Sequence, residues 1–198
     1  MKKIIIASAL MLAATTSSFG AVKGGKVGVN FQYSGTLPSL GVWWHLTDMI
    51  AINPYVGYDF SSTKDVYTGT TLTCGAATCT QTDKSNTLTL GIDIPLYVAQ
   101  FNALNLFIAP GFGYKSASGS TVTENSTAST SLTVDKGSTS TLAFGLAAGL
   151  QIAVLDQLHV FGKAGFDLNI ASNSASSNYS RTQFTTGRAS IGAIFYFN

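Results

Sequence analysis

Hydrophobic and polar residues alternate along residues 157–171, whose sequence is QLHVFGKAGFDLNIA. One set of alternate positions, which includes Leu158, Phe166 and Ile170, holds only apolar residues and glycine. The other set carries every charge in the segment, Lys163 and Asp167. Alternation with a period of two predicts a β-strand with one dry face and one wet face. The dry face could contact either a protein core or lipid.

The same alternation recurs in seven more segments, so the sequence predicts eight strands. They cover residues 26–34, 39–46, 50–60, 86–98, 104–115, 141–154, 157–171 and 183–197. All the charges within them fall on wet positions: Lys26, Asp59, Asp93, Lys115, Lys163, Asp167 and Arg188. Pro54 and Pro110 predict weakened pairing or bulges where they occur.

Short and long connections alternate between the predicted strands. The short ones cover residues 47–49, 99–103 and 156, and the long ones cover residues 61–85, 116–140 and 172–182. The first link, near residues 35–38, is a short one on the long-loop side. Outer-membrane barrels have short periplasmic turns and longer outside loops, whereas a soluble sandwich has no reason to sort its loops by length. We therefore expect the dry face to contact lipid.

Aromatic residues gather at the two ends of the dry face, as in the interfacial girdles of membrane barrels. At the loop end these residues are Tyr33, Tyr58, Phe60, Phe112 and Tyr114. At the turn end they are Trp44, Phe195 and Phe197, with Phe101 beside them.

Composition and the N-terminus agree with a secreted membrane protein. Charged residues make up only 10% of the chain, against about 25% in ordinary soluble proteins. Lys2 and Lys3 precede an apolar run over residues 4–14, which is typical of a secretory signal peptide. We expect a cleaved signal peptide over residues 1–20, with a cut after Ala21 as the alternative, and a barrel domain over residues 21–198. No later segment has the roughly 20 apolar residues of a transmembrane helix.

These features resemble the small eight-stranded outer-membrane barrels of the OmpA transmembrane-domain, OmpX/Ail and OmpW types. The predicted fold class is therefore all-β, an eight-stranded antiparallel up-and-down transmembrane barrel. The resemblance also rests on the last segment, residues 190–198, SIGAIFYFN, in which Asn198 follows the aromatic Phe197. It implies a monomer in contact with outer-membrane lipid and lipopolysaccharide, located in the bacterial outer membrane with its loops extracellular. It also implies that the barrel-assembly machinery reads the C-terminal strand.

The lumen of such a barrel is narrow and filled by side chains, so charges inside it must be paired. Asp93, Lys163, Asp167 and Arg188 fall in the middle of their strands and predict an ion network, which could be a gate or a neutralised plug. Strands 104–115 and 141–154 send small residues inward, opposite larger ones from the first two strands. Other polar residues expected in the lumen are Asn30, Gln32, His45 and His159.

No motif in the chain predicts catalysis, a cofactor or a metal site. Lipid-modifying barrels need a base near the outer leaflet, whereas His45 and His159 lie near the turn end. Cys74 and Cys79 predict a disulfide in a long loop, because the alternative, a metal site, lacks further ligands.

The near-neutral charge, formally +2, does not suggest nucleic acid as a partner. We expect a structural or surface role, with adhesion or binding of a host or surface ligand through the long loops 61–85, 116–140 and 172–182. Alternation over residues 121–124 and 131–135 suggests a hairpin above the membrane, with an exposed edge open to strand addition. Mobile, solvated loops are the plainer alternative. A narrow pore or small-molecule conduit is the alternative function.

Overall fold

The computed structural model describes residues 23–34, 37–68, 78–125, 130–173 and 180–197. Within these residues the strands are β1 (Val27–Ser34), β2 (Leu37–His45), β3 (Ala51–Thr68), β4 (Thr78–Asp93), β5 (Leu96–Phe101), β6 (Leu104–Asn125), β7 (Thr130–Ala153), β8 (Leu158–Asn173) and β9 (Ser180–Phe197). All the pairings between them are antiparallel. The described part of the chain contains no helix long and apolar enough to cross a membrane.

The strands form a closed ring with eight places, because β4 and β5 follow one another and both pair with β6. Closure occurs at β1, where Phe31 lies opposite Leu40 of β2 and Ala193 of β9. The register of the barrel is staggered. Starting from Asn30 and passing from each residue to its partner on the next strand, once around the ring, one arrives at Gln183 on β9. The direct partner of Asn30 on β9 is instead Ile194, eleven residues further along that strand. Such a stagger accompanies tilted strands in a barrel. The predicted fold class is confirmed.

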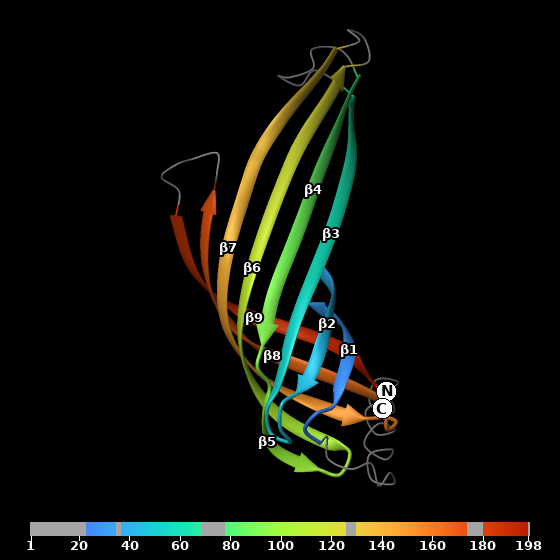
Figure 1. Cartoon of the computed structure of the whole chain (residues 1–198). Helices are drawn as coiled ribbons and strands as arrows, with labels where there is room; N and C mark the ends of the chain where they lie inside the picture. Colours follow the sequence, from blue (N-terminus) through green and yellow to red (C-terminus); the bar gives the residue numbers. More distant parts are fainter. Residues whose placement is uncertain (1–22, 35–36, 69–77, 126–129, 174–179, 198) are drawn as a thin grey trace, which may run out of the picture.

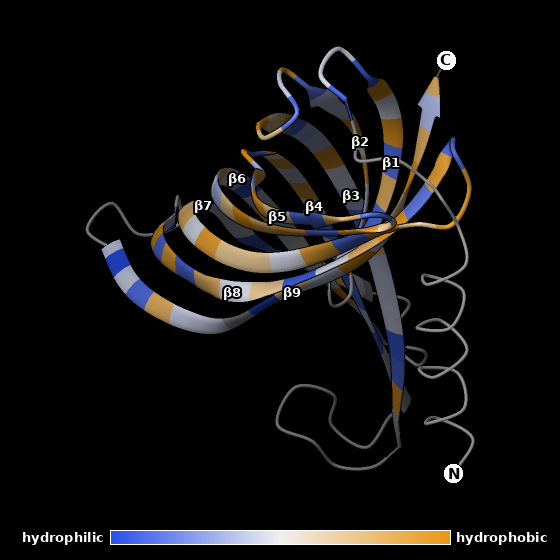
Figure 2. Ribbon diagram, turned by 90° about the horizontal axis from the view of Figure 1, so that it is seen from below, coloured by the Kyte–Doolittle hydropathy of each residue, from blue (hydrophilic) through white to orange (hydrophobic). Residues whose placement is uncertain are grey.

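The two faces of the strands follow the predicted parity. The predicted dry positions lie on the outside of the barrel, where Val42, Leu90 and Leu146 form part of an exposed apolar band. Most wet positions in the half of the barrel nearer the short connections point inward and are buried. Figure 2 shows the resulting stripes of hydrophobic and hydrophilic residues along each strand. In lipid, backbone groups need partners within the protein, and the closed ring supplies them along most of each strand.

Four strands continue far beyond the barrel and form what we call the projecting sheet: residues 61–68 of β3, 78–85 of β4, 116–125 of β6 and 130–140 of β7 (Figure 1). The prediction of long loops over residues 61–85 and 116–140 is therefore wrong for most of their length, and β8 and β9 likewise extend into 172–182. These segments are rich in threonine, which favours strands, and their backbones pair in continuous ladders. Residues 121–124 and 131–135 pair as the sequence suggested.

The ring is interrupted at prolines. The predicted continuous strand 86–98 is wrong at Ile94 and Pro95, which separate β4 from β5 opposite Pro110. Only the amide of Ile94 reaches across, donating to the Pro110 carbonyl at 2.9 Å. Pairing of β2 with β3 likewise has a gap opposite Pro54. A proline has no N–H to give to a ladder, so gaps are expected at these positions.

A bulge in β9, which the sequence analysis did not predict, reverses the parity of that strand. Gly165 lies opposite Arg188, but Phe166 lies opposite Thr186, so β9 contains one extra residue between them. As a result Phe184 points outward and contacts Phe166 with tilted rings, whose centroids lie 5.4 Å apart. Arg188 still points into the lumen.

Candidate functional site

The lumen is filled by large side chains at the turn end, the end of the barrel where the short connections lie. The buried residues come from β2, β5, β6, β8 and β9: Trp43, Tyr97, Phe107, Phe161, Ile194 and Tyr196. Edge and tilted contacts join the rings, such as Trp43 with Phe161 at 5.0 Å between centroids. We call this group the turn-end core. It closes the lumen at the turn end with close-packed aromatic rings, which prefer edge-to-face and offset contacts.

Hydrogen bonds satisfy many of the polar groups within the turn-end core. The Gln151 amide is central: its Oε1 accepts from the Tyr97 hydroxyl, and its Nε2 lies 3.1 Å from the Tyr196 hydroxyl. The same Nε2 lies 2.7 Å from Nδ1 of His159, and the Tyr196 hydroxyl lies 2.7 Å from Nε2 of His45. Both histidines are thus buried, and each has one ring nitrogen hydrogen-bonded within the turn-end core, whereas Nδ1 of His45 has no partner among the described residues.

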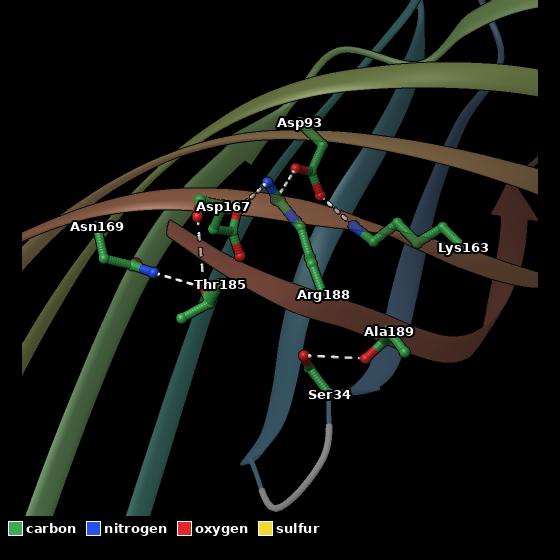
Figure 3. Close-up of polar contacts among 8 residues, drawn as sticks. All are labelled: Ser34, Asp93, Lys163, Asp167, Asn169, Thr185, Arg188 and Ala189. Atoms are coloured by element: carbon green, nitrogen blue, oxygen red, sulfur yellow. Dashed lines mark hydrogen bonds and ion pairs between the residues drawn. The ribbon is translucent and has the colours of Figure 1, made fainter. Parts of the chain in front are cut away.

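An ion cluster lies above the turn-end core, where four charged residues from three strands meet (Figure 3). Asp93, at the end of β4, accepts from Lys163 of β8 and from Arg188 of β9. The Arg188 guanidinium also donates to Asp167 of β8 at 2.9 Å. The side chains of Asp93 and Lys163 are only 1% and 4% exposed. Two acids and two bases leave the ion cluster formally neutral, which offsets the cost of burying its charges.

Small residues make the space that the ion cluster occupies. A Cβ built on Gly111 would lie 2.2 Å from Oδ1 of Asp93, and one on Gly145 would lie 1.9 Å from Nη1 of Arg188. A Cβ on Gly113, two residues further along β6, would meet nothing closer than 3.7 Å. The inward small residues on β6 and β7 therefore accommodate the Arg188 guanidinium.

The substitution Gly111→Ala is expected to lower the free energy of unfolding by about 1–3 kcal/mol, because its methyl group displaces Asp93 or Arg188 from their contact. The control is Gly113→Ala on the same strand and the same face, which is expected to change stability by less than about 1 kcal/mol. Urea unfolding of both variants in lipid vesicles measures the difference. Equal effects would contradict the packing described for the ion cluster.

A polar cavity of about 290 Å³ lies between the ion cluster and the loop end of the barrel. Lys163, Asp167 and Arg188 form its charged wall. Its other polar lining includes Gln32, Ser39, Tyr55, Thr89, Lys115, Thr141, Asn169 and Ser190. We call it the loop-end cavity. The lumen thus has three layers: an aromatic core, an ion cluster and a polar cavity.

The structure places most of the predicted site residues. It brings Asp93, Lys163, Asp167 and Arg188 together, and it buries Asn30, Gln32, His45 and His159 in the lumen. Of the predicted aromatic girdle residues, Tyr33, Trp44, Tyr58, Phe60, Phe195 and Phe197 are exposed on the outside, and Tyr114 is half-buried.

Sequence reasoning missed four lumen residues that carry contacts: Tyr55, Tyr97, Gln151 and Tyr196. Each lies on a wet position, so the three tyrosines and the long polar Gln151 at wet positions would have been the signal. Cys74 lies outside the described residues, and only the backbone of Cys79 is placed, opposite Tyr67 and Asn125. The disulfide stays a prediction. No group of three or more His, Cys, Asp or Glu residues that could hold a metal ion occurs in the described ranges.

Comparison with solved structures aligns the chain with three outer-membrane proteins at low identity. CarO2 from Acinetobacter baumannii aligns over 87% of this chain and 98% of that one, with 11% identity and a TM-score of 0.43. A major outer membrane protein from Thermus thermophilus aligns over 87% of this chain and 98% of that one, with 15% identity and a TM-score of 0.45. Ail, the attachment invasion locus protein of Yersinia pestis, aligns over 88% of this chain and 99% of that one, with 12% identity and a TM-score of 0.37.

No protein-family model matches the chain, and no curated protein sequence matches it. Because all three TM-scores are below 0.5, the fold assignment rests on the strand pairings of this chain and not on these similarities.

Proposed function

We propose that this chain is an outer-membrane barrel that presents the projecting sheet to a partner at the cell surface. The observation that carries the proposal is that the strands continue past the aromatic residues Tyr58 and Phe60 as a paired sheet. Ten residues of β6 beyond Lys115 correspond to roughly 34 Å of extended strand. A paired sheet of this length holds a binding surface in one shape, which loops of the same length would not do.

The projecting sheet has two edges that can accept another strand. Beyond Gly57, β3 pairs only with β4 among the described residues. Between Thr130 and Asp135, β7 pairs only with β6 in the same part of the structure. Unpaired backbone groups along such an edge are a template for strand addition by a partner.

Side-chain contacts fix the strands of the projecting sheet to one another. Asp83 of β4 accepts from Thr121 of β6 and from Lys136, which lies 3.0 Å away on β7. These two donors hold the pKa of Asp83 below its usual range. Because they favour the charged carboxylate, their contribution is present at neutral pH and is lost as the pH falls through the lowered pKa.

The face that carries Asp83 also carries two exposed apolar residues beside the β7 edge. Leu132 and Val134 lie on this face, because Val134 is opposite Thr121 and Leu132 is opposite Thr123. Thr133 between them points to the other face. A strand added to β7 would therefore gain main-chain hydrogen bonds and apolar contacts on the same side.

Adhesion of bacteria that express the chain to immobilised host cells tests the proposal. Relative to cells without the chain, we expect adhesion to increase, and we expect the double variant Leu132→Glu/Val134→Glu to abolish the increase. Thr133→Glu adds a charge to the same strand on the opposite face and is expected to leave adhesion unchanged. Equal adhesion with and without the chain, or equal loss in both variants, would contradict binding through this face.

The other candidate function, a steady pore, is not favoured by the turn-end core. Trp43, Tyr97, Phe107 and Tyr196 fill the lumen at that end, each no more than 2% exposed. Small barrels of eight strands are generally filled in this way. We expect no steady conductance in planar bilayers, and we expect Arg188→Ala to stay silent because it leaves the turn-end core in place. Steady single-channel steps from the unmodified barrel would favour a conduit instead.

Several parts of the proposal rest on the sequence alone. One is the cleaved signal peptide over residues 1–20, which lie outside the described residues. The proposal also includes a monomeric barrel in contact with lipid and lipopolysaccharide, and recognition of its last strand by the barrel-assembly machinery. In the structure that strand, β9, closes the ring against β1, with Phe197 opposite Val27.

A further inference from the structure

The loop-end cavity carries an excess of positive charge. Three cations, Lys115, Lys163 and Arg188, line it together with one carboxylate, Asp167. Asp93 lies beneath them, and its buried carboxylate accepts from both Lys163 and Arg188. One cationic charge remains, and it belongs to Lys115, which has no ion-pair partner among the described residues. The charge of the cavity thus favours an anionic ligand.

Two buried polar atoms of the cavity lining also lack partners. Oε1 of Gln32 and Oγ of Ser190 make no hydrogen bond within the described part of the chain. Gln32 is 6% exposed and Ser190 is 5% exposed, so neither is a solvated surface group. Buried polar atoms are normally hydrogen-bonded, and a polar ligand in the cavity would give both of these atoms a partner. An amide oxygen accepts hydrogen bonds, and a hydroxyl can donate or accept.

We propose that the loop-end cavity binds a small organic anion that carries hydroxyl groups, such as a sugar acid. Its carboxylate would take charge-assisted hydrogen bonds from Lys115 and from guanidinium N–H groups of Arg188 that face the cavity. Its hydroxyl groups would donate to Oε1 of Gln32 and bond with Oγ of Ser190. The ring of Tyr55, which lies beside Lys163 with Nζ 5.8 Å from its centroid, forms part of the wall. The site is separate from the projecting sheet, so either proposal can fail without the other.

Isothermal titration calorimetry on the purified barrel in detergent micelles tests this with gluconate and sorbitol as a matched pair. The two molecules have the same hydroxylated chain, but sorbitol has an alcohol in place of the carboxylate. We expect gluconate to bind in the millimolar range or tighter, and sorbitol to bind at least about tenfold more weakly. A tenfold difference corresponds to the lower end of what a hydrogen bond to a charged group contributes. Absence of gluconate binding, or equal binding of both molecules, would overturn the proposal.

Two variants locate the binding in the cavity. Gly113→Val adds a side chain that occupies the cavity, where the nearest atoms to a Cβ lie at 3.7–3.9 Å, and it is expected to abolish gluconate binding. Its control is Gly162→Val on β8, a position where only Ile191 lies within 4 Å of a Cβ, and binding is expected to persist. Unchanged binding in Gly113→Val would overturn the site.

Lys115→Gln keeps the residue long and polar but removes the unpaired charge. It is expected to weaken gluconate about tenfold and to leave sorbitol unchanged. It also provides a test that does not depend on the folding of Gly113→Val, because Lys115 is exposed. Gluconate affinity that stays the same in Lys115→Gln would contradict recognition of the anion by this side chain.

Discussion

Asp93→Asn is expected to lower the free energy of unfolding by about 3–5 kcal/mol. Among the described residues, Asp93 is the one carboxylate that touches both Lys163 and Arg188, and it is buried beneath these two residues of the cavity wall. The asparagine keeps the size of the side chain but removes its charge, so that the buried Lys163 loses its counter-ion and the partly buried Arg188 keeps only Asp167. Urea unfolding in lipid vesicles, followed by the fluorescence of Trp43 and Trp44, measures the change.

Asp167→Asn is the matched control for this substitution. Asp167 is 20% exposed and contacts only one of the two cations, Arg188. Its loss is expected to cost about 1 kcal/mol, the range of a partly solvated ion pair. Adding Lys163→Met to Asp93→Asn removes one unpaired cation and is expected to recover part of the loss. Equal costs for Asp93→Asn and Asp167→Asn would contradict the central place of Asp93.

Gly165→Ala is expected to destabilise the barrel by about 3 kcal/mol or more, the upper end of what overpacking costs. A Cβ at this position would lie 2.0 Å from the carbonyl oxygen of Leu146 and 2.6 Å from Cα of Ala147. These are backbone atoms of β7, so the clash cannot be relieved by turning a side chain. Gly165 lies opposite Arg188 at the bulge, and its substitution would therefore also move the ion cluster.

Gly162→Ala on the same strand separates this packing effect from the loss of a glycine as such. Its Cβ would meet only Ile191, at 4.0 Å, and it is expected to be tolerated. Migration of unheated and heated samples on a detergent gel, together with urea unfolding, compares the two variants. A Gly165→Ala barrel as stable as Gly162→Ala would show that β7 and β8 do not approach as closely as described.

The alternation of residues was enough to predict the ring and its two faces. Positions such as Val42 and Leu146 point outward because each strand keeps its parity over the whole apolar band. The same parity selected Asp93, Lys163, Asp167 and Arg188 for the lumen. Their depth followed from the lengths of the strands, because antiparallel neighbours place the middles of their strands at similar heights.

Two features could not be read from alternation. Most of the projecting sheet is built from threonine- and serine-rich segments, so residues such as Thr63 gave no apolar period to detect, and alternation was visible only over residues 121–124 and 131–135. The bulge of β9 adds one residue and reverses the parity of the strand on its N-terminal side, and only the tertiary pairing of Gly165 with Arg188 and of Phe166 with Thr186 reveals it. The apolar Phe184, on the opposite parity from Ile191 and Phe195, was the one trace of it in the sequence.

Cysteine labelling on intact bacteria tests the central claim, which is a barrel in the outer membrane with the projecting sheet outside the cell. Three single cysteines are placed in a chain with Cys74→Ser and Cys79→Ser: Ser62→Cys in the projecting sheet, Leu146→Cys on the apolar band and Asp156→Cys in a short turn. A membrane-impermeant maleimide is expected to label position 62 in intact cells. It is expected to label position 156 only after the outer membrane is permeabilised, and position 146 in neither case. Labelling of position 146 in water, or of position 156 in intact cells, would contradict the membrane barrel or its orientation.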